Sequence, residues 1–347
     1  MAVEWLLYAP AEQLNEATHY YIETVMRAAR ALGREPRHVE SLRSVPWNAD
    51  VFVVECKSAF KLRIARPHAR CWLWMQGVVP EEARLQFGSR WREALWTLFE
   101  RSTLPKAQGV LMVSQAMRAH FACKYGLTTL PTFVMPCANA ALDPASFWVP
   151  NKYRNPRFVY AGSMHTWQCF DLTLDVYRRV KAQCPRATLT VLTADQAQAR
   201  RAVEASSAAD IDIDIGFVPL AQLQATLATY KYGFVLRAPH VVNRVATPTK
   251  VSSYMAAGVI PVMTTAVDDY VTALRGIEPL VMCEHLDASK IAQAILDVEE
   301  RELQAGAVLR SYSAVFSRYF DHAAYDTPLR DFLQITGLQA ASDRHVA

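Results

Sequence analysis

Glycine is scarce in this sequence, and the glycine patterns that usually bind phosphate groups are absent. Only 12 of the 347 residues are glycine, no two form Gly-x-Gly, and none is followed by Lys-Ser or Lys-Thr. These absences exclude the dinucleotide fingerprint and the P-loop. The HExxH and GxSxG signatures of zinc proteases and α/β-hydrolases are missing as well. Any phosphate group must therefore be bound without a glycine-rich loop.

Cysteine pairs, a strong charge excess and long apolar runs are also absent. The seven cysteines include no Cys-x-x-Cys pair, so we interpret them as reduced core thiols rather than zinc or redox ligands. The 37 Lys and Arg residues against 33 Asp and Glu residues leave a net charge of +4, and we expect no nucleic-acid partner. With no apolar run of about 18 residues and no secretory leader pattern, we expect a cytoplasmic protein, free or at the inner face of the plasma membrane.

The chain does contain enough apolar material for two domains. Hydrophobic residues make up 52% of its 347 residues, and about 150 residues per domain is typical. Short β-branched runs at 49–55 and 109–114 predict buried strands, and amphipathic stretches at 15–33 and 115–126 predict helices. The same alternation resumes after a proline-rich stretch at 140–156, which we interpret as a linker.

This alternation predicts an α/β fold with two doubly wound, Rossmann-like domains that face a central cleft. We expect an N-terminal domain at 1–148, a C-terminal domain at 149–318, and a crossover helix with a tail at 319–347. The alternating Asp and Ile residues at 210–215 permit either a metal-binding D-x-D motif or a half-exposed strand. We favour the strand and expect no metal site.

The segment PTKVSSYMAAGVIPV at 248–262 gives the strongest functional signal. Pro248 marks the start of a helix and places Thr249 and Lys250 in its first turn. A lysine there opposes the positive end of the helix dipole, and a bound anion would relieve this conflict. The alternative is a solvated lysine at a surface helix.

The same segment resembles the C-terminal signature of retaining GT-B-fold glycosyltransferases, the family 4-like group. Four other segments resemble further parts of this family in the same order, so that the resemblance covers most of residues 1–320. They are WLWMQGVVPEEARLQF (72–87), VLMVSQAMRAHFACKYG (110–126), MPCAN (135–139) and RFVYAGSMHTWQCFDLTLDVYRRV (157–180). The resemblance implies an acceptor-side N-terminal domain and a C-terminal domain that binds a UDP- or GDP-linked sugar, without a further cofactor.

For the donor, the resemblance implies contacts at several strand ends of the C-terminal domain. Gly162 and Ser163 would meet the donor phosphates through backbone N–H groups, and Lys250 would contact the pyrophosphate. Phe217 and Val218 match the loop that usually holds the nucleobase. The donor-side residues are Gly162, Ser163, Trp167, Phe217, Val218, Asn243, Pro248, Thr249, Lys250 and Ser253. For Trp167, packing within the domain is an equally good interpretation.

For catalysis and the acceptor, the resemblance implies a site formed by both domains. The expected catalytic residues are Gln76, Gly77, Arg237 and Lys250, which would position the sugars and stabilise the leaving diphosphate. The acceptor-side residues are Glu16, Thr18, His19, Gln76, Glu81 and Ser114. Structural alternatives exist for His19 as a helix-surface residue and for Ser114 as a helix N-cap. Glu82 is a further candidate beside Glu81, but for these two the alternative is the acidic first turn of a helix that begins at Pro80, and we favour that alternative for Glu82.

One position departs from the family pattern. Ser253 stands where the family usually has a glutamate that binds the donor ribose, and Ala238-Pro239 replaces another acidic residue. Losing a charge-assisted hydrogen bond weakens donor binding by about 10- to 100-fold. The sequence thus leaves two hypotheses open: a glycosyltransferase, or a catalytically degenerate module that binds a nucleotide-sugar or a partner transferase.

In the first hypothesis, the sugar is transferred to a glycan, lipid-linked or protein acceptor, with retention, in bacterial polysaccharide assembly. Peripheral membrane contact is a further expectation. Arg84, Arg90 and Arg92, with Phe87 and Trp91 between them, could meet a lipid-linked acceptor. The alternative for these residues is a solvated amphipathic helix face.

Overall fold

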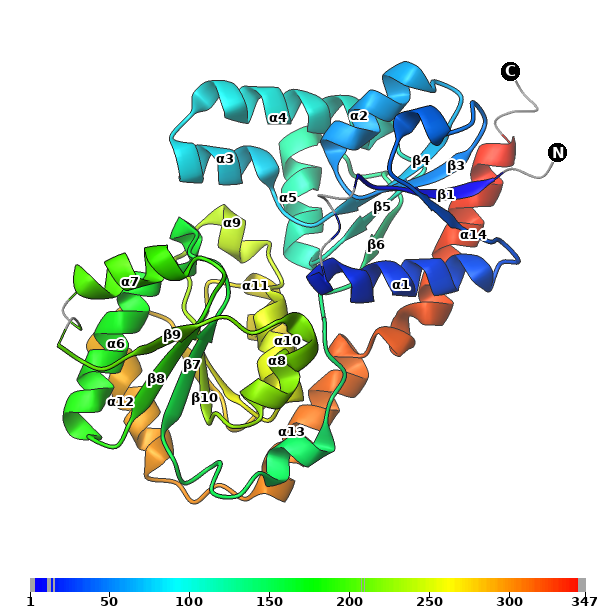
Figure 1. Ribbon diagram of the computed structural model, residues 1–347. Coiled ribbons are helices and arrows are strands. Elements are labelled where there is room, and N and C mark those ends of the chain that lie inside the picture. The colour runs from blue at the N-terminus through cyan, green and yellow to red at the C-terminus, as the bar shows by residue number, and fades with distance from the viewer. Residues whose placement is uncertain (1–3, 11–13, 15, 207, 209, 343–347) are drawn as a thin grey trace. The chain divides into compact units, whose positions relative to one another are not determined.

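The computed structural model describes residues 4–10, 14, 16–206, 208 and 210–342, without the side chains of residues 16, 17 and 338–342. The described chain forms two compact units (Figure 1). Unit 1 comprises Met1–Cys137, Val245–Thr247 and Asp321–Ala347, and unit 2 comprises Ala138–Arg244 and Pro248–Phe320. The first division therefore falls after Cys137 rather than after residue 148.

Unit 1 contains a six-stranded parallel sheet in the order β2-β1-β3-β4-β5-β6. Every residue of β1, β3 and β5 is buried, as expected for parallel strands covered by helices on both faces. The strands are β1 (Trp5–Tyr8), β2 (Arg37–Val39), β3 (Asp50–Val53), β4 (Arg70–Met75), β5 (Gly109–Met112) and β6 (Thr132–Val134). The helices are α1 (Glu16–Arg30), α2 (Cys56–Ala65), α3 (Val79–Phe87), α4 (Arg90–Thr103), α5 (Gln115–Tyr125) and α14 (Asp326–Ser342), with short turns at Leu42–Ser44, Leu104–Lys106 and His322–Tyr325.

The chain returns to unit 1 for its last helix, which is held there by specific polar contacts. The buried His322 ring lies 3.1 Å from the Thr24 hydroxyl, and Arg27 forms an ion pair of 2.8 Å with Asp326. The indole N–H of Trp72 donates a hydrogen bond of 2.8 Å to a hydroxyl on α14. Because these partners lie on α1 and β4, α14 is an integral layer of unit 1.

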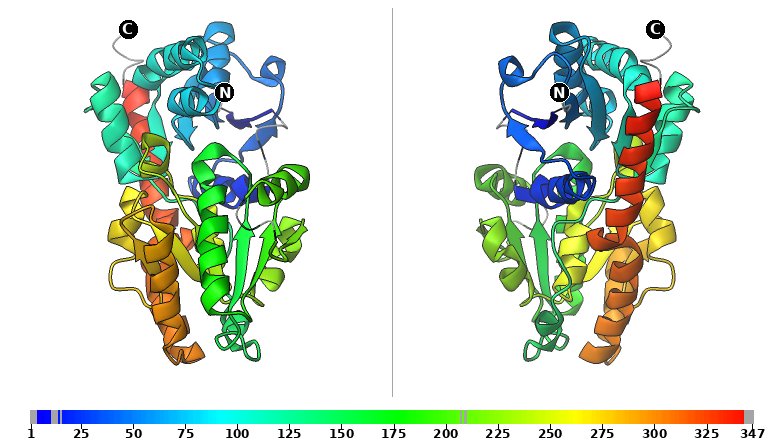
Figure 2. Two further views of the ribbon diagram at one scale, coloured as in Figure 1. Left: turned by 90° about the vertical axis from the view of Figure 1, so that its left-hand side faces the viewer. Right: turned by 90° about the vertical axis from the view of Figure 1, so that its right-hand side faces the viewer.

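Unit 2 contains a second six-stranded parallel sheet, in the order β12-β11-β10-β7-β8-β9. The strands are β7 (Arg157–Ala161), β8 (Thr188–Leu192), β9 (Asp214–Gly216), β10 (Tyr232–Val235), β11 (Ile260–Thr264) and β12 (Val281–Cys283). The helices are α6 (Phe170–Gln183), α7 (Gln196–Glu204), α8 (Leu220–Leu227), α9 (Val241–Arg244), α10 (Thr249–Ala256), α11 (Asp268–Ala273), α12 (Ala288–Glu299) and α13 (Ala305–Val315), with short helical turns at Pro144–Trp148, Thr166–Gln168 and Phe316–Phe320. Figure 2 shows helices on both faces of this sheet.

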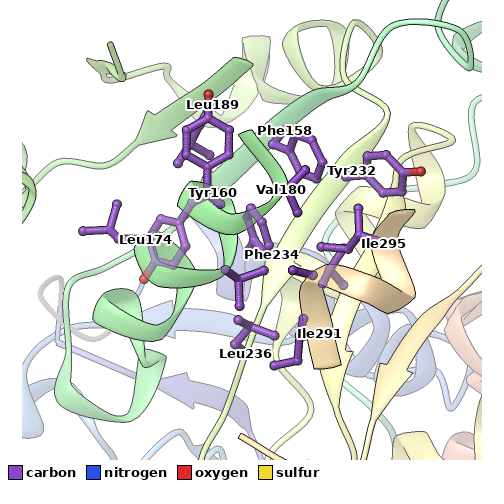
Figure 3. Close-up of a cluster of buried hydrophobic side chains, with 14 of the residues drawn as sticks. Phe158, Tyr160, Leu174, Val180, Leu189, Tyr232, Phe234, Leu236, Ile291 and Ile295 are labelled. Carbon is purple, nitrogen blue, oxygen red and sulfur yellow. The ribbon is translucent and has the colours of Figure 1, made fainter. Parts of the chain in front are cut away.

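The core of unit 2 is built on aromatic residues from neighbouring strands. Phe158 stacks on Tyr232 and on Phe234, with ring centroids 4.8 and 5.5 Å apart. Aliphatic side chains of α6 and α12, such as Val180 and Ile295, cover these rings (Figure 3). Phe158 and Tyr232 are also register partners in the pairing of β7 with β10.

The stretch expected to be a linker, 140–156, is instead packed into unit 2. Lys152 is buried, and its ammonium group donates to the carbonyls of Ser146 (3.1 Å), Ala228 (2.8 Å) and Ala257. Ala228 and Ala257 are the C-caps of α8 and α10, whose last carbonyls lack partners within their own helices. The three donors of one lysine therefore join three chain segments and stabilise the end of α10.

We expect Lys152→Met to destabilise unit 2 by about 3 kcal/mol or more, because it leaves three carbonyl groups without their donor. Lys290→Met is the matched control, since Lys290 is exposed on α12, and its free energy of unfolding should change by about 0.5 kcal/mol or less. Urea unfolding of both variants measures this difference. Equal midpoints for the two variants would contradict the capping role.

Candidate functional site

The strand order of unit 2 marks one edge of its sheet as a binding site. Read from β9, the strands follow the chain order 3-2-1-4-5-6, and the order reverses between β7 and β10, which pair directly. In open α/β sheets, ligands bind at the carboxyl ends of the strands at this reversal point. Gly162 and Ser163 follow β7, and Arg237 lies just beyond β10. The structure thus brings these three predicted residues to one edge.

Lys250 reaches this edge from the first turn of α10, which begins after Pro248. Its ammonium group donates a hydrogen bond of 2.8 Å to the side-chain oxygen of Gln168 and lies 4.4 Å from the ring centroid of Tyr160. A Cβ atom on Gly162 would lie 2.9 Å from the same ammonium group. The ammonium group therefore lies directly over the turn that follows β7.

Arg237 is the second cation at this edge, and its side chain is only 5% exposed. Its backbone N–H donates to the hydroxyl of Thr264 (3.1 Å), and its guanidinium donates to the amide oxygen of Asn243 (3.0 Å). The Asn243 amide group in turn donates to the carbonyls of Ala238 (2.9 Å) and Trp167 (3.4 Å). From the sequence, Asn243 is expected to contact the sugar-nucleotide donor. In the structure, its side chain holds the Arg237 guanidinium in place.

The charges at this site are not balanced within the described part of the chain. Burial and the nearby charge of Arg237 lower the pKa of Lys250 well below its usual value, and burial lowers the pKa of Arg237 to about 10. No described carboxylate forms an ion pair with either side chain, and the Nε atom of Arg237 is buried without a hydrogen-bond partner. Buried cations are normally paired, so this arrangement favours a bound anion with at least two charges.

The other predicted donor residues lie around this edge with different roles. The Ser163 hydroxyl accepts a hydrogen bond of 3.3 Å from Gln168, and Trp167 stacks on His165 at 4.5 Å. Phe217 and Val218 directly follow β9, and the Phe217 side chain is 56% exposed.

Ser253, at the position of the family glutamate, is buried and bound within unit 2. Its hydroxyl lies 2.6 Å from the Asn139 amide oxygen and 3.1 Å from the Thr249 carbonyl. The serine hydroxyl therefore already has acceptors inside the protein.

Sequence reasoning missed two residues that contact the Lys250 ammonium group, Gln168 and Tyr160. Both are far from Lys250 in the chain, and neither belongs to a short motif. The only available signal was their position: Tyr160 lies on the strand that leads into Gly162, and Gln168 lies on the turn that follows it.

Unit 1 has a cavity of about 350 Å³ at the carboxyl ends of β3 and β4. Gln76 and Gly77 line it, as do the side chains of α3 and α4 that face the sheet. The acidic and aromatic lining residues are Glu55, Glu82, Glu100, Trp74 and Trp96. Burial raises the pKa of both Glu82 and Glu100. Because the described lining contains no basic residue, it favours uncharged hydroxyl groups over phosphate.

The remaining acceptor-side predictions do not belong to this described lining. Glu81 instead pairs with His120 (3.1 Å) and Lys124 (2.8 Å) on α5, while its neighbour Glu82 faces the cavity. Ser114 caps α5 through the backbone N–H of Met117 and donates a hydrogen bond of 2.6 Å to a carbonyl of unit 1.

The three predicted residues near the start of α1 have no described role at the cavity. Thr18 is half-buried and His19 is exposed on this helix. Glu16 is the first residue of α1, and its side chain lies outside the described residues. Their acceptor-side role stays a prediction.

We expect Gly162→Ala to weaken binding of inorganic pyrophosphate by about 10- to 100-fold, the equivalent of one charge-assisted hydrogen bond. Its φ of 147° disfavours any side chain, and the new methyl group would displace the Lys250 ammonium group. Gly216→Ala is the control, because no atom beyond its own chain neighbours lies within 4 Å of its added Cβ. Calorimetric titration of both variants decides the point; wild-type affinity in Gly162→Ala would refute this geometry.

Comparison with known proteins gives a clear result at the level of structure only. No family model matches the chain, and no curated protein matches it. The chain is similar to Anabaena Alr3699/HepE, solved in complex with UDP and glucose, with a TM-score of 0.67 and 12% identity over 96% of this chain and 99% of that one. It is also similar to a trehalose-phosphate synthase from Burkholderia xenovorans, solved with glucose-6-phosphate, with a TM-score of 0.62 and 12% identity over 90% and 78% of the two chains.

A third neighbour is TarM from S. aureus, with a TM-score of 0.61 and 11% identity over 85% of this chain. The chain spans only 56% of the length of TarM. All three neighbours are GT-B glycosyltransferases. At such low identity, the similarity establishes the fold alone. The chain therefore has the GT-B fold, built from two Rossmann-like α/β units with parallel six-stranded sheets.

Proposed function

We propose that this chain is a glycosyltransferase that takes its sugar from a nucleoside-diphosphate sugar. One observation carries the proposal: Lys250 and Arg237 lie at the binding edge of the unit 2 sheet without a described carboxylate partner. A sugar nucleotide supplies two adjacent negative phosphate groups, which match two adjacent cations. The structural neighbours solved with UDP favour a UDP-linked donor over a GDP-linked one.

In this proposal, the two cations act on the leaving group. Negative charge develops on the diphosphate as the bond to the sugar breaks, and preorganised cations in a buried site stabilise that charge. Lys250 is placed by Gln168 and Tyr160, and Arg237 is placed by Asn243. Gly162 lets the backbone approach the phosphate closely, because it has no side chain. Retention and metal-independent transfer belong to the same proposal.

For the acceptor, we propose that the cavity in unit 1 binds an uncharged glycan hydroxyl. Gln76, which directly follows β4, and Glu82, on α3, both line the cavity. A carboxylate whose pKa is raised by burial is a stronger base, and it can accept the proton of an incoming hydroxyl group. The carboxylates of this lining disfavour a phosphorylated acceptor. A cytoplasmic role in bacterial polysaccharide assembly is consistent with such an acceptor.

A second candidate function is a module that binds a nucleotide-sugar without turnover. The observation that favours it is Ser253, which replaces the family glutamate and directs its hydroxyl to Asn139 within unit 2. Without a carboxylate at this position, the donor ribose loses a charge-assisted hydrogen bond. Such a module would still bind the diphosphate through Lys250 and Arg237.

We expect Lys250→Met to lower the affinity for UDP-glucose by about 10- to 100-fold, because it removes one charged donor to the diphosphate. Lys290→Met, which changes an exposed lysine of α12, should bind like the wild type. Calorimetry with UDP-glucose and GDP-mannose measures binding, and release of UDP or GDP in the presence of neutral oligosaccharides measures turnover.

The outcomes of this experiment separate the two candidates. Binding with turnover supports the glycosyltransferase, and binding without turnover of either donor supports the non-catalytic module. If neither sugar nucleotide binds, or if Lys250→Met binds as well as the wild type, the donor site proposed for unit 2 is wrong.

A further inference from the structure

Exposed apolar side chains are concentrated on one part of unit 1. Ten large hydrophobic residues of the described chain are exposed, and four of them belong to α3 and α4, which form a hairpin (Figure 1). We call these four residues the α3–α4 stripe: Phe87, Trp91, Leu95 and Leu98, with exposed fractions of 60%, 66%, 40% and 55%. The spacing of 4 and then 3 residues from Trp91 to Leu98 places the three α4 members on one face of the helix.

The opposite face of α4 supplies the packing that holds the helix on unit 1. Trp96 meets Phe99 edge to face at 5.6 Å, and Phe99 contacts Phe60 of α2 at 5.0 Å. Glu100 is buried at the cavity described above. Other residues of α4 therefore make its packing contacts with unit 1, and the α3–α4 stripe is not needed for them.

Arginines flank the stripe on both sides. Arg92 lies 4.4 Å from the ring centroid of Phe87 and 5.7 Å from that of Trp91. At about 100° per residue, Arg90 and Arg101 fall on the other flank of the helix. All three arginines are exposed, and none forms an ion pair with a described carboxylate.

The carboxylates of the hairpin do not offset this positive charge. Glu93 lies 3.9 Å from Arg84, and Glu81 pairs with His120 and Lys124 on α5. The other two carboxylates of α3 and α4, those of Glu82 and Glu100, line the cavity. The outer face of the hairpin is thus apolar along its centre and positive along its edges.

We propose that the α3–α4 stripe docks on an anionic lipid bilayer. A helix that lies in a membrane interface has this pattern, in which tryptophan, phenylalanine and leucine enter the headgroup boundary and arginines meet the lipid phosphates. Charge complementarity selects anionic lipid as the partner. No described helix is long and apolar enough to cross a membrane. The proposal does not depend on the proposed transfer activity, since it concerns a different surface and is tested without a sugar nucleotide.

The test is co-sedimentation of the full chain with vesicles of phosphatidylcholine alone or mixed with phosphatidylglycerol, at low and high salt. We expect binding to the mixed vesicles that weakens with salt. The double variant W91S/L98S should reduce this binding by about tenfold or more, because it removes apolar anchors. The matched control is W148S/I335S, which changes an exposed tryptophan (63%) and an exposed aliphatic residue (55%) outside the hairpin. The control should bind like the wild type.

Charge is tested separately with R90Q/R92Q. Each arginine near an anionic surface contributes roughly fivefold to binding, so this variant should bind the mixed vesicles about 25-fold more weakly. R154Q/K290Q removes two exposed positive charges from unit 2 and should have little effect. Circular dichroism confirms that each variant is folded.

Several results would overturn the proposal. One is absence of wild-type binding to the mixed vesicles, and another is equal loss in the stripe variant and its control. A third is a wild-type protein that is a dimer in sedimentation velocity, together with a W91S/L98S variant that is a monomer and binds vesicles like the wild type. That result would make the stripe an interface between two copies of the chain.

Discussion

Two basic side chains held at one sheet edge without a described counter-charge are the constraint on which this account depends. Burial, and then the nearby charge of Arg237, lower the pKa of Lys250, so a charged ammonium group is unfavourable here without an anion. Contacts within unit 2 hold both side chains at this edge: Gln168 and the Tyr160 ring contact the ammonium group, and Asn243 accepts a hydrogen bond from the guanidinium. The unfavourable charge arrangement becomes favourable once a dianionic group lies between or beside the two cations.

Residues outside the site hold the backbone segments that carry its side chains. The Thr264 hydroxyl on β11 accepts a hydrogen bond from the Arg237 N–H and donates one to the Arg237 carbonyl, which ties the segment after β10 to β11. Lys152 satisfies the carbonyl at the end of α10, the helix that carries Lys250 at its start. The φ of 147° at Gly162 keeps the turn after β7 free of a side chain. Site and fold are thus supported by the same contacts, and weakening the scaffold should loosen the site.

Short-range rules predicted a large part of this arrangement. The helix start at Pro248 and the strand ends before Gly162 and Arg237 follow from local patterns, so the two sheets and the position of these residues at one sheet edge were predictable, while their role in donor binding stays a prediction. Contacts between distant residues were not. Lys152 caps helix ends 76 and 105 residues away in the chain, so the proline-rich stretch around it was wrongly interpreted as a linker.

The acceptor side shows the same limit at the scale of one helix. Glu81 and Glu82 are neighbours in the sequence, but adjacent residues on a helix point about 100° apart. Which of the two faces the cavity depends on how α3 packs against α4 and α5, and no local pattern records this. The sequence offered both residues as acceptor-side carboxylates, and Glu81 was chosen because an acidic first helical turn explained Glu82 better; the structure instead places Glu82 in the cavity lining.

The most direct test of the central claim is the number of protons taken up when UDP-glucose binds. The diphosphate of UDP-glucose keeps a constant charge near neutral pH, so any protons taken up on binding must be bound by a group of the protein. A bound diphosphate raises the lowered pKa of Lys250, so binding should take up protons, and affinity should fall as pH rises above the pKa that Lys250 has in the free protein. Calorimetry in buffers with different ionisation enthalpies should show this uptake in the wild type and its loss in Lys250→Met. Binding without proton uptake, or with the same uptake in the variant, would contradict the account.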